Sequence, residues 1–150
     1  MKIGIGCDTK GFYLKLHLIK VLKEYGHQVD DVGCFSLEKV DYPDLAERVG
    51  TGVVSGKYNF GVLICGTGIG MSIAANKIKG VRAALCYDTL PAILSREHNN
   101  ANVFCTGGWL MTKEKAAEVL LQWLDMKYVR GGHQDKLDKI EMLEKKFGEF

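Results

Sequence analysis

The sequence predicts an α/β fold of three layers, with a five-stranded parallel sheet between two layers of helices. Short apolar runs alternate five times with longer amphipathic stretches along the 150 residues. Connections of this length are the crossovers that parallel strands require. Hydrophobic residues make up 47% and charged residues 25% of the sequence, so the chain can bury a sizeable core as a single domain.

Five segments have the composition of strands. The first is a short apolar run, KIGIG, and the third, FGVLIC, is apolar throughout, as expected of a strand buried on both faces. The second is the weakest of the set. The predicted strands cover residues 2–6, 28–32, 60–65, 81–86 and 102–106.

Six segments have helical spacing or helical boundary signals. Leu14, Leu18 and Val21 recur at helical spacing and Gly26 can end their helix, while Pro43 suits the first turn of the next one. The predicted helices cover residues 14–25, 44–54, 68–77, 89–98, 113–126 and 134–147. Together these elements give a Rossmann-like α/β/α arrangement with an extra C-terminal helix.

Charge and cysteine content exclude several classes of function. The formal net charge is +2, which gives no case for nucleic acid or an anionic membrane. The five cysteines have neither Cys-x-x-Cys nor Cys/His ligand spacing, so we expect no metal site. Without a signal peptide or an apolar membrane run, reduced thiols in the cytoplasm are the natural expectation.

The turn after the third strand carries the clearest chemical signal. Ligands of open α/β sheets bind beyond the carboxyl ends of the strands, and residues 65–70 (CGTGIG) stand at such an end. Three glycines in five residues let backbone N–H groups approach a ligand, and a helix start there can hold an anion. A thiol beside a helix start ionises readily, so Cys65 could be a nucleophile or a general base. A small core residue that ends a strand is the equally good alternative.

Other residues near the strand ends also have two interpretations. Asp8 could hold substrate hydroxyls or cap the helix that follows. The helix that ends at His98 starts at the ligand edge and runs back, so His98 is expected at the opposite edge, as a solvated or capping residue or as a catalyst for a neighbouring subunit. The turn after Cys65 is neither a P-loop, which needs a Lys-Ser/Thr pair, nor the dinucleotide fingerprint.

Residues 65–77 (CGTGIGMSIAANK) closely resemble the signature of the type B ribose-5-phosphate isomerases, a family that includes the galactose-6-phosphate isomerase subunits. Further matches follow in family order over nearly the whole chain. They are Gly6-x-Asp8, VDYPD at residues 40–44, GVRAALC at 80–86, REHN at 96–99 and GGHQ at 131–134.

The resemblance implies a reversible aldose–ketose isomerisation of a phosphorylated sugar through a cis-enediol(ate), without cofactor or metal. It implies that Cys65 is the base, that Thr67 assists proton transfer to the sugar oxygens and that His98 opens the ring. It further implies that the remaining substrate contacts come from the backbone of Gly66, Gly68, Ile69 and Gly70 and from the side chains of Asp8, Tyr42 and Asn99. A homodimer or homotetramer with shared active sites is expected.

The sequence departs from the family pattern where the phosphate is held. Thr9 replaces a His but is still expected to contact substrate, and Trp109 replaces an Arg. We expect Trp109 to be a buried packing residue, with stacking on a sugar face as the alternative. Positive charge for the phosphate could instead come from Lys10, Arg130, His133 and Lys136.

These departures leave the substrate open. Ribose 5-phosphate, whose isomerisation is a reaction of the pentose phosphate pathway, is the first expected substrate. The alternative substrates are galactose 6-phosphate, allose 6-phosphate and a tetrose phosphate. Two other hypotheses are a non-catalytic sugar-phosphate-binding subunit of a hetero-oligomer and a nucleotide-binding module. Residues 1–150 are expected to form one sugar-phosphate isomerase domain, whose helix at 134–147 either docks on a partner subunit or covers its own sheet.

Overall fold

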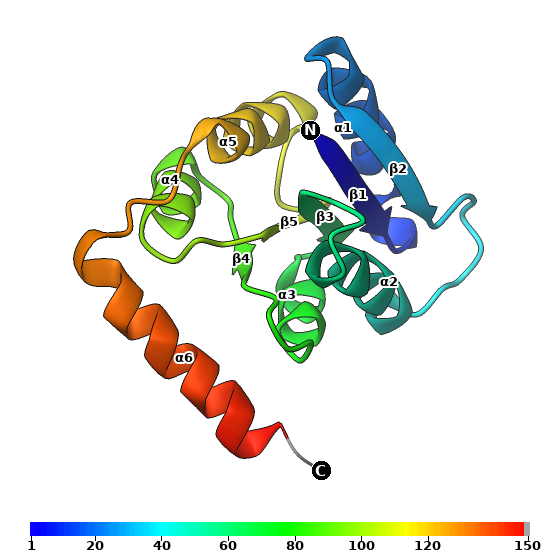
Figure 1. The fold of residues 1–150 in the computed structure, drawn as a ribbon. Coiled ribbons are helices and arrows are strands. Elements are labelled where there is room, and N and C mark those ends of the chain that lie inside the picture. Colours follow the sequence, from blue (N-terminus) through cyan, green and yellow to red (C-terminus); the bar gives the residue numbers. More distant parts are fainter. Residues whose placement is uncertain (149–150) are drawn as a thin grey trace.

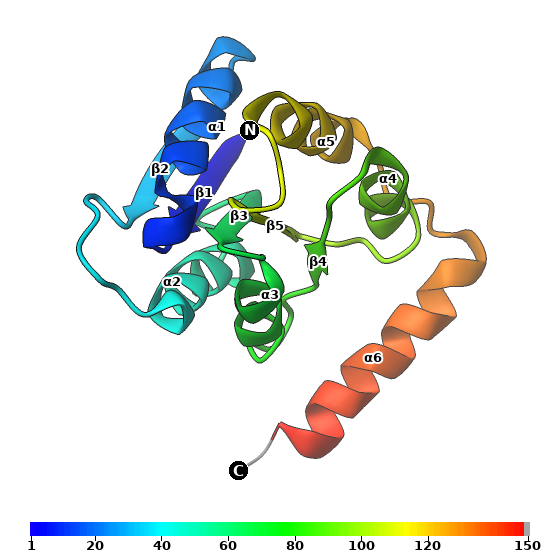
Figure 2. The same cartoon turned by 180° about the vertical axis from the view of Figure 1, so that it is seen from behind.

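The computed structural model describes residues 1–148 and contains a parallel sheet with helices on both faces (Figures 1 and 2). The strands lie in the order β2-β1-β3-β5-β4. They are β1 (Lys2–Cys7), β2 (Gln28–Gly33), β3 (Phe60–Cys65), β4 (Ala83–Leu85) and β5 (Val103–Gly107). The helices are α1 (Phe12–Glu24), α2 (Tyr42–Val54), α3 (Ile69–Ala75), α4 (Thr89–Glu97), α5 (Lys113–Asp125) and α6 (Gln134–Phe147), with short 3₁₀ turns η1 (Thr9–Gly11) and η2 (Gly131–His133). The predicted fold class is confirmed.

The direction of each crossover decides which face its helix covers. Right-handed connections place the helix on one face when the chain moves one way across the sheet and on the other face when it moves back. From β2 to β3 and from β3 to β4 the chain crosses the sheet in the same direction, and the connecting helices α2 and α3 pack side by side (Figure 1). From β1 to β2 and from β4 to β5 the chain crosses the sheet in the opposite direction. The connecting helices α1 and α4 lie together on the other face, where α5 packs against both.

Each face of the sheet has its own apolar core. On the side of α1, α4 and α5, the buried indole of Trp123 packs edge-on against Phe60 and Phe104, with ring centroids 5.1 and 5.8 Å away. On the side of α2 and α3, Leu63 and Val49 are fully buried. Strand β3 lies in the middle of the sheet and packs into both cores, which is why its sequence is apolar at every position.

Strand β4 is shorter than the predicted segment of residues 81–86. The side-chain amide of Asn76 donates to the Ala83 carbonyl at 2.9 Å and accepts from the Ala83 N–H at 2.8 Å. Before it, the Arg82 N–H donates to the side chain of Asn102 rather than to a strand. The Asn76 side chain therefore covers the free edge of β4 at Ala83, and the Asn102 side chain takes the N–H with which a longer strand would begin.

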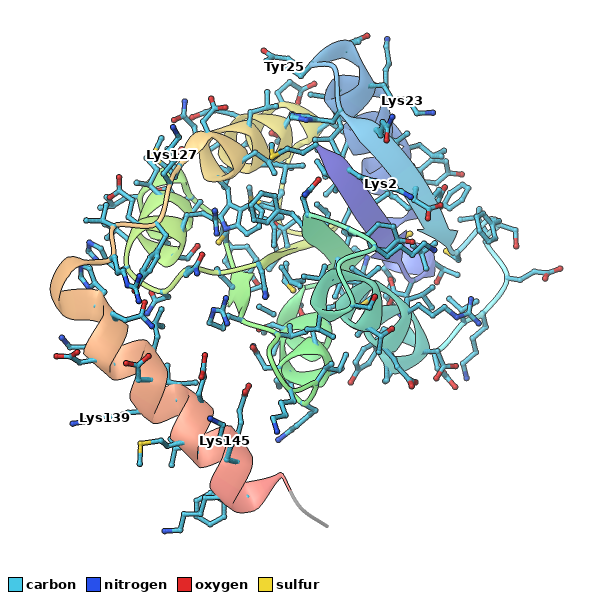
Figure 3. All side chains as sticks on the ribbon, in the orientation of Figure 1. Lys2, Lys23, Tyr25, Lys127, Lys139 and Lys145 are labelled. Carbon is cyan, nitrogen blue, oxygen red and sulfur yellow. The ribbon has the colours of Figure 1, made fainter. Side chains whose placement is uncertain are left out.

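Helix α6 extends beyond the β4 side of the sheet (Figures 1 and 2), and its Glu144 carboxylate accepts the Gly80 N–H at 3.2 Å. Leu137 is buried at its base, whereas Ile140, Leu143 and Phe147 are exposed. Figure 3 shows Lys139 pointing away from the rest of the chain. No helix within residues 1–148 has the length and apolar character that crossing a membrane requires.

Candidate active site

A cavity of about 190 Å³ opens at the carboxyl end of β3. The connection after β3 leaves towards the face of α2 and α3, whereas the connections after β1 and β5 leave towards the opposite face. Diverging connections of this kind create the crevice in which open α/β sheets bind ligands. The cavity is lined by Asp8, Lys10, Tyr42, Cys65, Gly66, Thr67, Gly70 and Trp109.

The Cys65 sulfur lies at the floor of this cavity and accepts a hydrogen bond from the N–H of Gly68 at 3.0 Å. Its residue is only 6% exposed, so the thiol reaches solvent through the cavity. Gly68 makes this bond in a left-handed conformation, with φ of 80°. A Cβ there would lie 2.7 Å from the backbone carbonyl of Thr106, so the turn requires glycine. A directed N–H donor is suited to stabilise negative charge on the sulfur.

Three other cysteines are held as thiols by burial. Burial raises the pKa of Cys7 and of Cys105 well above that of an ordinary thiol, and raises the pKa of Cys86 to about 11. Cys65 differs from these three because it lines the cavity and receives a backbone donor. Within the described residues, no three His, Cys, Asp or Glu side chains gather as a metal site.

Two hydrogen bonds hold Thr67 in place. Its hydroxyl oxygen accepts the Ile69 N–H at 3.2 Å, and its carbonyl accepts the hydroxyl of Tyr87. Since the Thr67 oxygen already accepts a bond, its own O–H proton is free to be donated towards the cavity. Tyr87, whose pKa is raised by partial burial and by the nearby Cys65, was not predicted as a site residue. Its place directly after the fourth strand was the available signal.

Asp8 combines the two roles that its sequence position allows. One carboxylate oxygen, Oδ1, caps η1 by accepting the N–H groups of Lys10 at 2.9 Å and Gly11 at 3.2 Å. The other, Oδ2, lies 3.7 Å from the Lys10 ammonium. Asp8 is buried at the cavity wall, while Lys10 is exposed and Thr9 beside it half-buried.

Aromatic side chains form the two flanks of the cavity. The Tyr42 ring lies against the backbone of Gly70, and the Trp109 indole lies against the backbone of Gly66. Trp109 is 66% exposed, so the expectation that it is a buried packing residue is wrong. The loop after β5 turns back towards β3, where the Trp109 N–H donates to the Gly66 carbonyl at 3.0 Å, and this turn directs the indole outwards.

His98 lies at the far end of α4, at the amino edge of the sheet, as its position in the sequence predicted. Its ring stacks on that of His133, with 4.1 Å between centroids and 17° between planes. Asn99 is exposed beside it and lines a separate cavity of about 420 Å³ beneath α6. Arg130 is exposed before η2, and the Lys136 ammonium donates to the Gly132 carbonyl at 3.1 Å. One chain therefore brings the predicted site residues together as two groups, around Cys65 and around His98.

The chain is similar over nearly its full length to known sugar phosphate isomerases. The family model described as Ribose/Galactose Isomerase matches residues 3–140. Ribose-5-phosphate isomerase B of Escherichia coli (strain K12) is 42% identical over 145 residues, covering 97% of both chains. D-erythrulose-4-phosphate isomerase of Pectobacterium atrosepticum is 39% identical over 141 residues, covering 93% of both.

A solved structure gives the same answer for the fold. The solved structure of Clostridium thermocellum ribose-5-phosphate isomerase B superposes with a TM-score of 0.97 at 43% identity, covering 98% of this chain and 99% of that one. With the family model spanning nearly the full length and relatives above 30% identity, the chain belongs to the ribose/galactose isomerase family and is an isomerase.

Proposed function

We propose that the chain interconverts an aldose and a ketose sugar phosphate through a cis-enediol(ate), with ribose 5-phosphate as the default substrate. The observation that carries the proposal is the Cys65 sulfur, which borders a cavity and lies 3.0 Å from the N–H of Gly68. A proton beside a carbonyl is removed by a base held close to it, with donors aimed at the oxygen that becomes negative. The glycine-rich turn supplies the base and backbone donors within six residues.

The proton transfer can be written with Cys65 and Thr67 alone. The Cys65 thiolate takes the proton from carbon 2 of the open-chain aldose, the C–H electron pair forms the C1–C2 double bond, and the carbonyl electrons move to oxygen 1. The thiol, whose proton can exchange with solvent at this stage, then gives a proton to carbon 1 as the C2–O2 carbonyl forms. The Thr67 hydroxyl donates a proton to oxygen 1 and recovers one from oxygen 2, so atoms and charges balance.

Asp8 and Tyr42 would hold sugar hydroxyls at the cavity walls. The Asp8 carboxylate, whose second oxygen takes no backbone N–H, can accept a hydroxyl proton. The Tyr42 ring against Gly70 places an aromatic surface on the α2 side of the cavity. Lys10 is the cation of this cavity wall and the candidate phosphate contact.

The site would be completed by a second copy of the chain. Ligand cavities usually measure about 300–1,000 Å³, against about 190 Å³ here. His98 and Asn99, assigned to ring opening and hydroxyl binding, lie at the other edge of the sheet with Arg130, His133 and Lys136. We assign this second group to the partner's site, with a homodimer as the smallest assembly.

Helix α6 suits such an assembly. Its apolar residues Ile140, Leu143 and Phe147 are 42%, 55% and 58% exposed in a single chain, and burying them on a partner would be favourable. Residues 1–150 then form one isomerase domain per subunit. The free cysteines suit the reducing conditions of the cytoplasm.

The test is turnover of a panel of sugar phosphates by the purified chain, with Cys65→Ala as the matched control. The panel contains ribose 5-phosphate, galactose 6-phosphate, allose 6-phosphate and a tetrose phosphate. We expect turnover of at least one by the wild type and none by the variant. No turnover of any member would favour a non-catalytic subunit, and a fully active Cys65→Ala protein would exclude the thiol as base.

Subunit mixing tests the shared site separately. Cys65→Ala and His98→Ala chains are each expected to be inactive, while mixed oligomers carry one site with both residues intact. Recovery of part of the activity supports the proposal. Mixed oligomers that form but stay inactive would exclude it.

A further inference from the structure

Trp109 is placed unlike the other tryptophan of the chain. The sequence holds two tryptophans, and Trp123 is fully buried, with its indole N–H donating to the Ser95 hydroxyl at 3.0 Å. Trp109 is 66% exposed. Large aromatic surfaces are favoured away from water, and this indole is held open at the wall of the cavity that Cys65 lines, where a ligand can cover it.

The exposed indole is held in place by the turn that carries Cys65. The Trp109 N–H donates to the Gly66 carbonyl at 3.0 Å. Three carbons of the benzene part of the indole lie 2.8, 2.9 and 3.0 Å from where a Gly66 Cβ would stand. The ring therefore rests on the backbone of the residue that follows the proposed base, and its position is defined relative to the sulfur.

Lys10 gives the same wall a positive charge. Its ammonium lies 5.9 Å from the centroid of the Trp109 ring and 3.7 Å from the Asp8 carboxylate. Among the residues that line the cavity within the described chain, Lys10 is the one cation. The wall thus presents a flat apolar surface and a carboxylate, with the ammonium close to both.

We infer that Trp109 is a specificity-determining residue, whose indole stacks on the carbon–hydrogen face of the sugar while Lys10 contacts the phosphate. A sugar phosphate has each of the matching parts: C–H groups for the indole, hydroxyls for Asp8 and a dianion for Lys10. Recognition of the carbon skeleton is then separate from recognition of the phosphate. This inference rests on the proposed function for its ligand class and extends it to the residue that selects among sugars.

Fluorescence gives a direct readout, because Trp123 is shielded in the core. We would titrate the Cys65→Ala protein, which binds without turnover, with each sugar phosphate of the panel, with inorganic phosphate and with free ribose. Stacking predicts that a sugar phosphate changes the emission saturably and that inorganic phosphate leaves it unchanged. When Trp109→Phe is added to the Cys65→Ala protein, the fluorescence change should disappear, whereas binding of the sugar phosphate, measured by calorimetry, should remain.

Kinetics supply the second readout. Trp109→Ala should raise KM about tenfold with kcat within about twofold, since the indole takes no part in the proton transfer and binds the sugar equally before and during the reaction. Trp109→Phe should retain most of the affinity. Leu110→Ala is the matched control, because Leu110 is 57% exposed on the same loop and does not line the cavity.

The outcomes separate this inference from the proposed function. An active wild type whose Trp109→Ala variant keeps the same KM, without a fluorescence change on binding, overturns the role of Trp109 alone. An inactive wild type whose Trp109 emission responds to a sugar phosphate leaves the stacking role standing and overturns the isomerisation. If no sugar phosphate binds at all, both fail.

Discussion

Replacing Gly68 by Ala perturbs the one bond that joins the turn to the proposed base. Gly68 adopts φ of 80° and donates its N–H to the Cys65 sulfur at 3.0 Å. A non-glycine residue in this left-handed region loses about 1–2 kcal/mol. The new Cβ would also stand 2.7 Å from the Thr106 carbonyl carbon and oxygen, which are backbone atoms of β5 and cannot move aside without disturbing the sheet.

Gly26→Ala is the matched control for this substitution. Gly26 has the same φ of 80°, but its Cβ would meet nothing within 4 Å. Both substitutions place alanine at the same positive φ and so have the same cost in backbone conformation. Both also stabilise the protein equally by reducing the conformational entropy of the unfolded chain. The difference between their unfolding free energies therefore isolates the overpacking at Gly68, which we expect to be about 1–3 kcal/mol.

Activity should fall because the shifted turn no longer aims the N–H of residue 68 at the Cys65 sulfur. Hydrogen bonds to charged groups are worth about 1.5–3 kcal/mol, which corresponds to roughly a 10- to 100-fold lower kcat/KM. Urea unfolding and steady-state kinetics on the best substrate of the panel measure both effects at a temperature where the variant is folded. The reasoning is refuted if Gly68→Ala keeps wild-type kcat/KM, or if it is destabilised no more than Gly26→Ala.

Three further predictions concern thiols, the turn and pH. Iodoacetamide should alkylate Cys65, which lines the cavity, well before Cys86, whose pKa is raised to about 11 by burial. Bound sugar phosphate should protect Cys65 from alkylation. Mass spectrometry that shows Cys86 labelled first would contradict this prediction. Tyr87→Phe removes the O–H donor to the glycine-rich turn and should lower kcat/KM about fivefold, the value of one hydrogen bond; an unchanged value would remove Tyr87 from the site. The hydrogen bond from Tyr58 lowers the pKa of Asp30, so its stabilisation is present above the ordinary carboxyl pKa and is lost as the pH falls through the lowered one. Because Asp30 is 40% exposed, the coupling is worth less than about 1 kcal/mol; urea unfolding of Tyr58→Phe should show its deficit at neutral pH and a smaller one near about pH 2.5, and equal deficits would exclude the coupling.

Local chemistry in the sequence accounts for most of the fold. Alternating apolar and amphipathic segments predicted every helix and strand to within a few residues. Strand β4 was predicted too long, because the side chain of Asn102, just before β5, takes the Arg82 N–H in front of the strand. The order of the strands depends on which connections reverse direction, and no local pattern in the sequence records that choice.

The candidate site was predictable where glycines and strand ends define it. The turn after Cys65 carries its own backbone signature, and the direction of α4 placed His98 at the opposite edge. The exposure of Trp109 was not predictable, because it depends on how the loop after β5 turns back onto Gly66. Tyr87 was missed for a similar reason, since its hydroxyl crosses from the end of β4 to a carbonyl of another loop.

Hydrogen exchange at the substrate carbon tests the role of Cys65 most directly. With the accepted sugar phosphate in heavy water, proton NMR should show the wild type introducing deuterium at carbon 2 of the aldose. The Cys65→Ala protein should introduce none while it still binds the sugar. Deuterium entering carbon 2 at the wild-type rate in that variant would mean that another group moves the proton.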